Sequence, residues 1–116
     1  MAPGARANGR RGEVEAVIDG ERRVLCLTLG SLAELETAFG AGDLQGLAER
    51  FSSGRIRSAD MIRILGAGLR GGGNLYSDEE VAAMSVEGGL TGAAGVVGAL
   101  LAATFNGPQE AGRPDP

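Results

Sequence analysis

The stretch Glu13-Val-Glu-Ala-Val-Ile-Asp-Gly-Glu-Arg-Arg-Val-Leu-Cys-Leu-Thr-Leu29 decides how the fold of this chain begins. Two runs that alternate apolar and polar residues flank Asp19-Gly20, and this arrangement is typical of a β-hairpin with a two-residue turn. Such a turn places Val14 opposite Leu25 and leaves Glu15, Arg22 and Thr28 on the solvent-exposed face. The other face would collect the apolar side chains Val14, Ala16, Ile18, Leu25, Leu27 and Leu29.

Sequence signals for helices follow the hairpin. Helices are expected to pack on its apolar face, because an isolated hairpin is only marginally stable. A capping box at Ser31-Leu-Ala-Glu34 predicts a helix that starts at Ser31 and ends at Gly40. Asp43 is the expected N-cap of a second helix. The apolar face of that helix would consist of Leu44, Leu47, Ala48 and Phe51.

A third helix is expected from Ser58 to the glycines 71–73, and it should be central because apolar residues surround most of it. These residues are Met61, Ile62, Ile64, Leu65 and Leu69. A second capping box, Ser77-Asp-Glu-Glu80, opens a short helix to about Met84, and a last helical segment runs from about Val86 to Phe105.

The fold class predicted from these signals is α+β, with an N-terminal β-hairpin followed by four to five short packed helices. One domain should span residues 12–105, since this length supports a single modest core. Residues 1–11 form an expected disordered basic arm and residues 106–116 an expected disordered tail, because neither carries apolar periodicity.

The composition excludes several kinds of chemistry. The chain has no histidine and a single cysteine, Cys26, so neither a His-based catalytic site nor a Cys-rich zinc site can form. We therefore expect no enzyme activity, no cofactor and no metal, and we expect Cys26 to be a buried thiol in a reducing compartment. The net charge of −4 argues against a nucleic-acid partner, and the N-terminus lacks the apolar core of a signal peptide, which predicts a cytoplasmic protein.

Two patterns that resemble catalytic motifs are better explained structurally. Gly66-Ala-Gly-Leu-Arg-Gly71 matches the dinucleotide pattern GxGxxG, but these glycines close a helix instead of opening one, so they predict close packing and a helix stop. The acidic triplet at residues 78–80 lies in a first helical turn, where it complements the helix dipole.

Two features are candidate partner-binding surfaces. Arg55 and Arg57, with Arg63 and Arg70, form either a solvated basic face or a docking site for an acidic protein surface. Residues 90–105 carry no charge but are too short and too rich in small residues for a membrane span. Leu90, Val97, Leu101 and Thr104 share one stripe of this helix. The second, small-residue stripe consists of Gly88, Gly92, Gly95, Ala99 and Ala102. It packs either inside the domain or against a partner or second copy.

Two blocks resemble a family encoded in gene transfer agents, the phage-like particles of alphaproteobacteria, with relatives among tailed-phage tail genes. The blocks are Thr28–Gly40 and Ile62–Gly73, the second followed by Ser77-Asp-Glu-Glu-Val81, and the likeness runs from about Gly12 to Phe105. The resemblance implies a tail protein without catalytic residues.

That resemblance leads to a functional expectation with two rivals. The leading one is a cytoplasmic, chaperone-like tail-assembly protein that binds another tail component, such as the tape-measure protein, and that can also self-associate. The alternative is a structural subunit of the tail tube, incorporated into the virion-like particle. Tube subunits are built on substantial β-sheets, whereas this sequence offers two strands. An enzyme is the third and weakest hypothesis.

Overall fold

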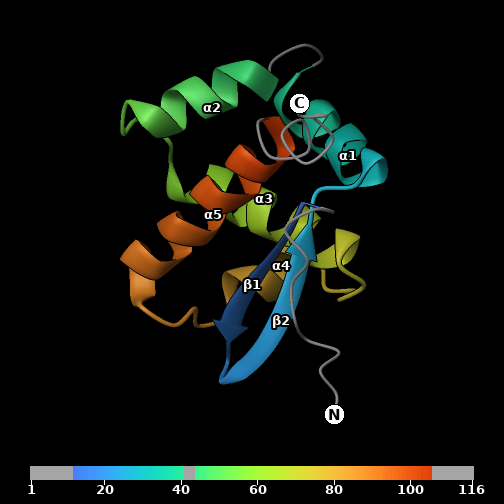
Figure 1. The fold of residues 1–116 in the computed structure, drawn as a ribbon, viewed down its shortest axis with the longest axis vertical. Helices are drawn as coiled ribbons and strands as arrows, with labels where there is room; N and C mark the ends of the chain where they lie inside the picture. The colour runs from blue at the N-terminus through green and yellow to red at the C-terminus, as the bar shows by residue number, and fades with distance from the viewer. Residues whose placement is uncertain (1–11, 41–43, 106–116) are drawn as a thin grey trace, which may run out of the picture.

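The computed structural model describes residues 12–40 and 44–105 as a β-hairpin followed by five helices (Figure 1). The predicted α+β fold is therefore confirmed. The elements are β1 (Glu13–Ile18), β2 (Glu21–Cys26), α1 (Leu29–Phe39), α2 (Leu44–Ser52), α3 (Ser58–Gly71), α4 (Asp78–Ala82) and α5 (Gly89–Phe105). The expected basic arm, the expected C-terminal tail and the Asp43 cap lie outside the described residues.

The hairpin has the register that the Asp19-Gly20 turn predicts. β1 and β2 are antiparallel, and Val14 lies opposite Leu25. Both turn residues have positive φ, 53° at Asp19 and 82° at Gly20, as a type I′ turn requires. Ala16, Ile18 and Leu25 are buried on the inner face of the hairpin.

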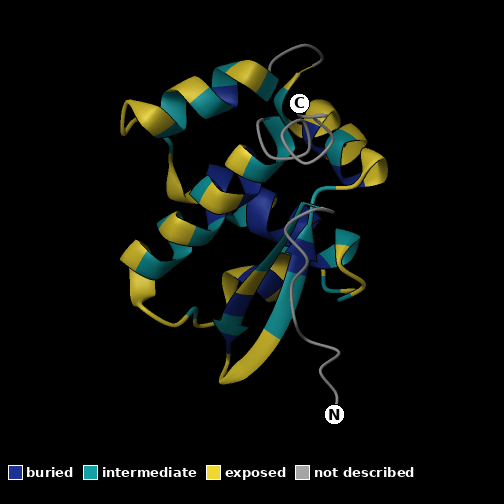
Figure 2. Cartoon of the chain, in the orientation of Figure 1, coloured by how far each residue is buried: buried dark blue, intermediate teal, exposed yellow. Residues whose placement is uncertain are grey.

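Helix α3 is the central element, as its apolar circumference predicts. It packs against β2, α1, α4 and α5. Figure 2 shows the middle of the molecule, where α3 lies, as its most buried part. The buried residues of α3 are Asp60, Met61, Ile64, Leu65, Gly66, Ala67, Gly68 and Leu69.

Glycines at the C-terminal half of α3 allow the helix to approach the hairpin backbone. A Cβ atom at Gly71 would overlap the Cys26 carbonyl, and one at Gly72 would overlap the Val24 carbonyl. A Cβ at Gly68 would lie 2.9 Å from Leu100 Cδ1 of α5. These glycines therefore serve close packing, as predicted for the GxGxxG pattern.

The predicted helix start at Ser31 is wrong. Helix α1 begins at Leu29, and its N-cap is Thr28, whose Oγ1 accepts a hydrogen bond from the Ser31 N–H at 3.1 Å. Ser31 is instead buried, and its Oγ donates to the Ala67 carbonyl of α3 at 2.8 Å. Glu34 reaches Arg70 across the α1–α3 interface. The serine that resembles a cap thus joins two helices.

Leu29, which the strand alternation assigned to the apolar face of the hairpin, is exposed, and so is Leu90 of the apolar stripe on α5. Leu29 is 85% exposed because it is the first residue of α1 and no longer follows the strand alternation. Leu90 is 69% exposed because the start of α5 extends past the core, and the buried residues of α5 all lie in its second half. The last helix also starts later than Val86, which forms a β-bridge with Ile18.

Candidate functional site

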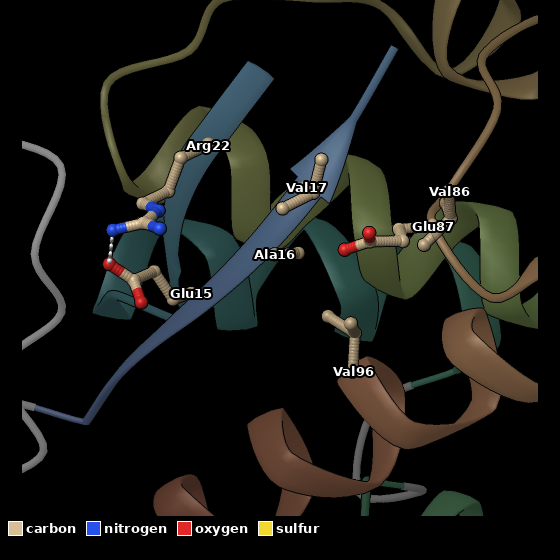
Figure 3. Close-up of a pocket in the computed structure, with 7 residues that line it drawn as sticks. All are labelled: Glu15, Ala16, Val17, Arg22, Val86, Glu87 and Val96. Carbon is tan, nitrogen blue, oxygen red and sulfur yellow. Dashed lines mark ion pairs between the residues drawn. The ribbon is translucent and has the colours of Figure 1, made fainter. Parts of the chain in front are cut away.

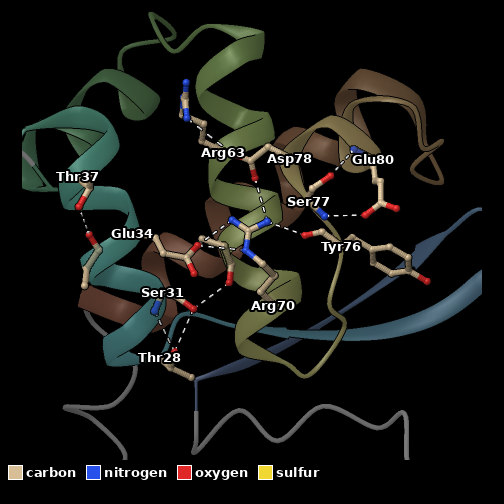
Figure 4. A network of polar contacts seen from close by, with 12 residues as sticks. Thr28, Ser31, Glu34, Thr37, Arg63, Arg70, Tyr76, Ser77, Asp78 and Glu80 are labelled. Atoms are coloured by element: carbon tan, nitrogen blue, oxygen red, sulfur yellow. Dashed lines mark hydrogen bonds and ion pairs between the residues drawn. The ribbon is translucent and has the colours of Figure 1, made fainter.

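A polar network around Arg70 joins α1, α3 and α4 (Figure 4). Arg70 Nη2 donates to Glu34 Oε1 at 2.8 Å, and Nη1 donates to the Tyr76 carbonyl at 2.7 Å. Nη1 also lies 3.1 Å from Asp78 Oδ1, and Arg63 lies 3.7 Å from the other oxygen of that carboxylate. The hydrogen bond to Glu34 raises the pKa of Arg70 further, so the guanidinium stays charged.

Two residues of the acidic triplet, Asp78 and Glu80, make polar contacts in and beside this network. Asp78 pairs with the two arginines, and Glu80 accepts from the Ser77 N–H at 2.8 Å while Ser77 Oγ accepts from the Glu80 N–H. The second predicted capping box is therefore confirmed. Within residues 12–40 and 44–105, no group of three His, Cys, Asp or Glu residues is placed to hold a metal ion.

The surroundings of the Cys26 thiol lower its reactivity. It is half-buried, and burial raises its pKa, with a further increase from the negative charge of Glu13. A raised pKa keeps the thiol protonated near neutral pH, and the protonated form is a poor nucleophile. Among the described helices, none combines the length and apolarity that a membrane crossing requires.

The two edges of the sheet differ in how their backbone groups are used. In a hairpin closed by a two-residue turn, alternate residues point their N–H and C=O groups outward, here Val24 and Cys26 on β2 and Glu15 and Val17 on β1. Asn74 Nδ2 donates to the Val24 carbonyl at 2.9 Å, and Ser31 Oγ lies 3.5 Å from the Cys26 carbonyl. The Val24 carbonyl is therefore occupied, and a Cβ at Gly71 or Gly72 would overlap the Cys26 or Val24 carbonyl, so Asn74 and the end of α3 cover this part of the β2 edge.

The β1 edge is open along part of its length. The Val17 carbonyl accepts from the Glu87 N–H at 2.9 Å, which ends the pairing of this edge with residues 85–87. Within the described part of the chain, no backbone hydrogen bond occupies the Val17 N–H or the outward N–H and C=O of Glu15. Such free groups are able to pair with another strand.

A hollow of about 260 Å³ lies beside this open edge (Figure 3). Val86 and Val96 supply apolar surface on the side away from β2, and the Glu87 carboxylate points between them and β1. Glu15 and Arg22 lie on the other side of β1 as an exposed ion pair at 3.8 Å. We call the open backbone of residues 15–17 and this hollow the β1-edge site.

The predicted basic residues Arg55 and Arg57 line a second hollow, of about 470 Å³. Arg50 lies there too, together with Phe39 and Ala38 from the end of α1. Among the described residues of its lining, Asp60 is acidic, and it lies 3.7 Å from Arg57 Nε. The structure does not bring Arg63 and Arg70 to this hollow, because both pair with Asp78. We call this region the basic hollow.

The predicted small-residue stripe of α5 does not line the core. Gly88, Gly95, Ala99 and Ala102 are exposed, and a Cβ at Gly95 would meet nothing within 4 Å. Gly92 is half-buried against the Glu87 carbonyl of its own entry loop. The glycine of α5 that permits internal packing is Gly98, where a Cβ would lie 2.9 Å from the Phe51 ring of α2.

The described residues thus form a small α+β protein with a partly open β1 edge and a basic hollow on its surface. A family model described as "Phage tail tube protein, GTA-gp10" matches residues 11–107. Because the match covers most of the chain, the protein belongs to this gene transfer agent and phage tail family. No curated protein and no solved structure matches the chain significantly.

Sequence reasoning missed Asn74, Glu87 and Gly98. Asn74 follows a run of glycines, which predicts only a loop, yet its side chain donates to the Val24 carbonyl at the β2 edge. Glu87 lies between two helices, and its position beside β1 depends on a contact 70 residues apart in sequence, between Glu87 and Val17. Gly98 was hidden among the other small residues of its helix.

Proposed function

We propose that this chain is a non-catalytic tail-assembly protein that binds another tail component, such as the tape-measure protein, in a chaperone-like manner. The observation that carries this proposal is the cover of the β2 edge at Val24 and Cys26 by Asn74 and the end of α3. A wall made by joining sheets from subunit to subunit needs a free edge on both sides of every sheet. A sheet with one open edge is suited to accept a partner segment and not to continue a wall.

A structural subunit of the tail tube is the second candidate. The description of the family names a tail tube protein, and this favours incorporation into the particle. A tube built from this chain would have to use helical faces, or else displace Asn74 and the end of α3 from the β2 edge.

The candidate partner-binding residues are proposals within this function. The exposed part of the small-residue stripe, Gly95, Ala99 and Ala102, permits close approach of an apolar helix, since Ala102 also borders a hollow lined by Phe51, Leu101 and Phe105. Arg55 and Arg57 offer a basic surface to an acidic partner. The net charge gives no support for binding to nucleic acid.

The test compares purified particles with the cells that produce them. An affinity-tagged chain should co-purify the tape-measure protein or another tail protein from the lysate, and quantitative mass spectrometry should find the chain depleted from finished particles. The untagged chain in the same cells is the control. Recovery of many copies of the chain per finished particle would contradict the chaperone role and favour the tube subunit.

A further inference from the structure

We propose that copies of this chain associate head to tail, with the Arg55-Ile56-Arg57 segment of one copy seated on the β1-edge site of the next. This contact goes beyond the proposed function, because it is made between copies and does not depend on whether the protein stays in the particle. It joins the open backbone of the β1-edge site to the side chains of Arg55 and Arg57. The Arg55 and Arg57 N–H groups themselves donate to the Arg50 carbonyl and to Asp60 Oδ2, so the N–H left for the edge is that of Ile56.

The accepting surface combines open backbone with negative charge. The outward N–H and C=O of Glu15 and the Val17 N–H have no hydrogen-bond partner among the described residues. The Glu87 carboxylate forms no ion pair or side-chain hydrogen bond within residues 12–40 and 44–105, and the pair between Glu15 and Arg22 is long and exposed. An exposed pair of this kind contributes little and is easily exchanged for another.

The entering segment has matching chemistry. Residues 55–57 connect α2 to α3 without helical structure, and Arg57 is in an extended conformation with φ −98° and ψ 161°. The Arg57 side chain is 81% exposed, and its pair with Asp60 is long. An arginine has an apolar stem and a charged head, so its stem fits Val86 and Val96 while its guanidinium reaches Glu87 or Glu15.

A second copy is the occupant that charge and placement favour. In Figure 1 the α2–α3 connection lies in the upper half of the molecule, whereas the hairpin turn and the loop that leads into α5 lie at the lower end, so one chain cannot make the contact with itself. Symmetric pairing of two β1 edges would place Glu13 and Glu15 of one copy against the same glutamates of the other, and facing like charges are destabilising. A contact between two different surfaces is heterologous and leads to a ring or a filament.

A charge-swap experiment on the full chain tests the contact. Variant A carries Arg55→Glu and Arg57→Glu, and variant B carries Glu15→Arg and Glu87→Arg. Sedimentation velocity over a concentration series should show that the native chain self-associates, more weakly at high salt. Each variant alone should associate at least about tenfold more weakly, which corresponds to about 1.4 kcal/mol. An equal mixture of A and B should regain association, because the reversed segment of A complements the reversed edge of B.

The matched control is Glu36→Arg with Glu49→Arg, which changes the net charge as variant B does but at exposed positions outside both surfaces. Val17→Pro is a further variant that removes an outward N–H from the edge strand without removing a hydrogen bond between β1 and β2. The control should associate like the native chain, and Val17→Pro should not associate while keeping its circular dichroism spectrum. A native chain that stays monomeric at about 1 mM, a concentration at which even a free energy of about −4.1 kcal/mol gives detectable association, would overturn the proposal. So would an A and B mixture that remains as dissociated as its components.

Discussion

Gly71 and Gly95 both lie in helices, but a side chain would clash with neighbouring atoms at Gly71 and would meet no atoms at Gly95. At Gly71 a side chain would enter the space of the Cys26 carbonyl and the Ser31 hydroxyl, and a backbone carbonyl within a sheet cannot move aside cheaply. At Gly95 a side chain would project into open space. The first glycine is needed for packing, whereas the second only makes its helix less stable.

This difference predicts opposite signs for the same substitution. Gly71→Ala should lower the free energy of unfolding by about 1–3 kcal/mol through overpacking. Gly95→Ala should raise it by up to about 1 kcal/mol, because alanine is the better helix former. Urea denaturation of the two variants measures both effects. Midpoints that shift in the same direction would show that the α3–hairpin contact is looser than the structure has it.

The hydroxyls of Thr28 and Ser31 have separate roles that substitution can distinguish. Thr28→Ala removes the cap of α1 and should cost about 0.5–2 kcal/mol, while Thr28→Ser should keep most of it. Ser31→Ala removes the hydrogen bond to Ala67 and should cost about 0.5–1.5 kcal/mol. Because the two oxygens lie 3.1 Å apart, the double variant should be non-additive. A double-mutant cycle by chemical denaturation measures this coupling. If Thr28→Ala left the free energy of unfolding unchanged, Thr28 would not be the N-cap of α1, and Ser31 would be the better candidate.

At the scale of elements, signals that depend on neighbouring residues predicted the structure well. Asp19-Gly20 predicted the hairpin register, Ser77–Glu80 predicted the start of α4, and Gly40 predicted the end of α1. The start of α1 could not be predicted because Thr28 and Ser31 are both suitable caps three residues apart. The contact that decides between them is made with Ala67, 36 residues away.

The candidate surfaces show the same limit. Arg55 and Arg57 are close in sequence and could be predicted as one basic feature, and the structure places both at the basic hollow. The β1-edge site is assembled from β1, the loop before α5, and α5 itself. No sequence pattern joins those three segments, since only tertiary packing brings them together.

Helix α5 offers a test of whether its exposed stripe binds a partner. Gly92→Leu should destabilise the protein by about 1–3 kcal/mol, because its Cβ would overlap the Glu87 carbonyl. Gly95→Leu should leave the fold intact but weaken binding if the stripe contacts a partner, since leucine blocks close approach. Thermal melts together with co-purification of tail proteins separate these effects. A Gly95→Leu variant that retains full binding would remove the stripe from the list of docking surfaces.

At the scale of the whole molecule, α3 determines whether the protein unfolds as one unit. The helix contacts the hairpin and three of the other helices, α1, α4 and α5. The fully buried side chains include Leu25 of the hairpin, Leu35 of α1, Ile64 and Leu69 of α3, and Leu100 of α5. Since these residues share one core cluster, loss of packing in α3 must be felt in every element that it touches.

Ile64→Ala is therefore expected to destabilise the whole domain and not one helix. Ile64 is fully buried, so the truncation should cost about 2–5 kcal/mol, a large part of the stability of a domain of this size. Ile62→Ala, at a half-buried position of the same helix, is the matched control and should cost less. Native-state hydrogen exchange should show similar increases in the slowest amides of α1, α3, α5 and the hairpin for Ile64→Ala. If the hairpin kept its native protection while the helices lost theirs, the molecule would unfold in two independent parts, and α3 would not be the element that joins them.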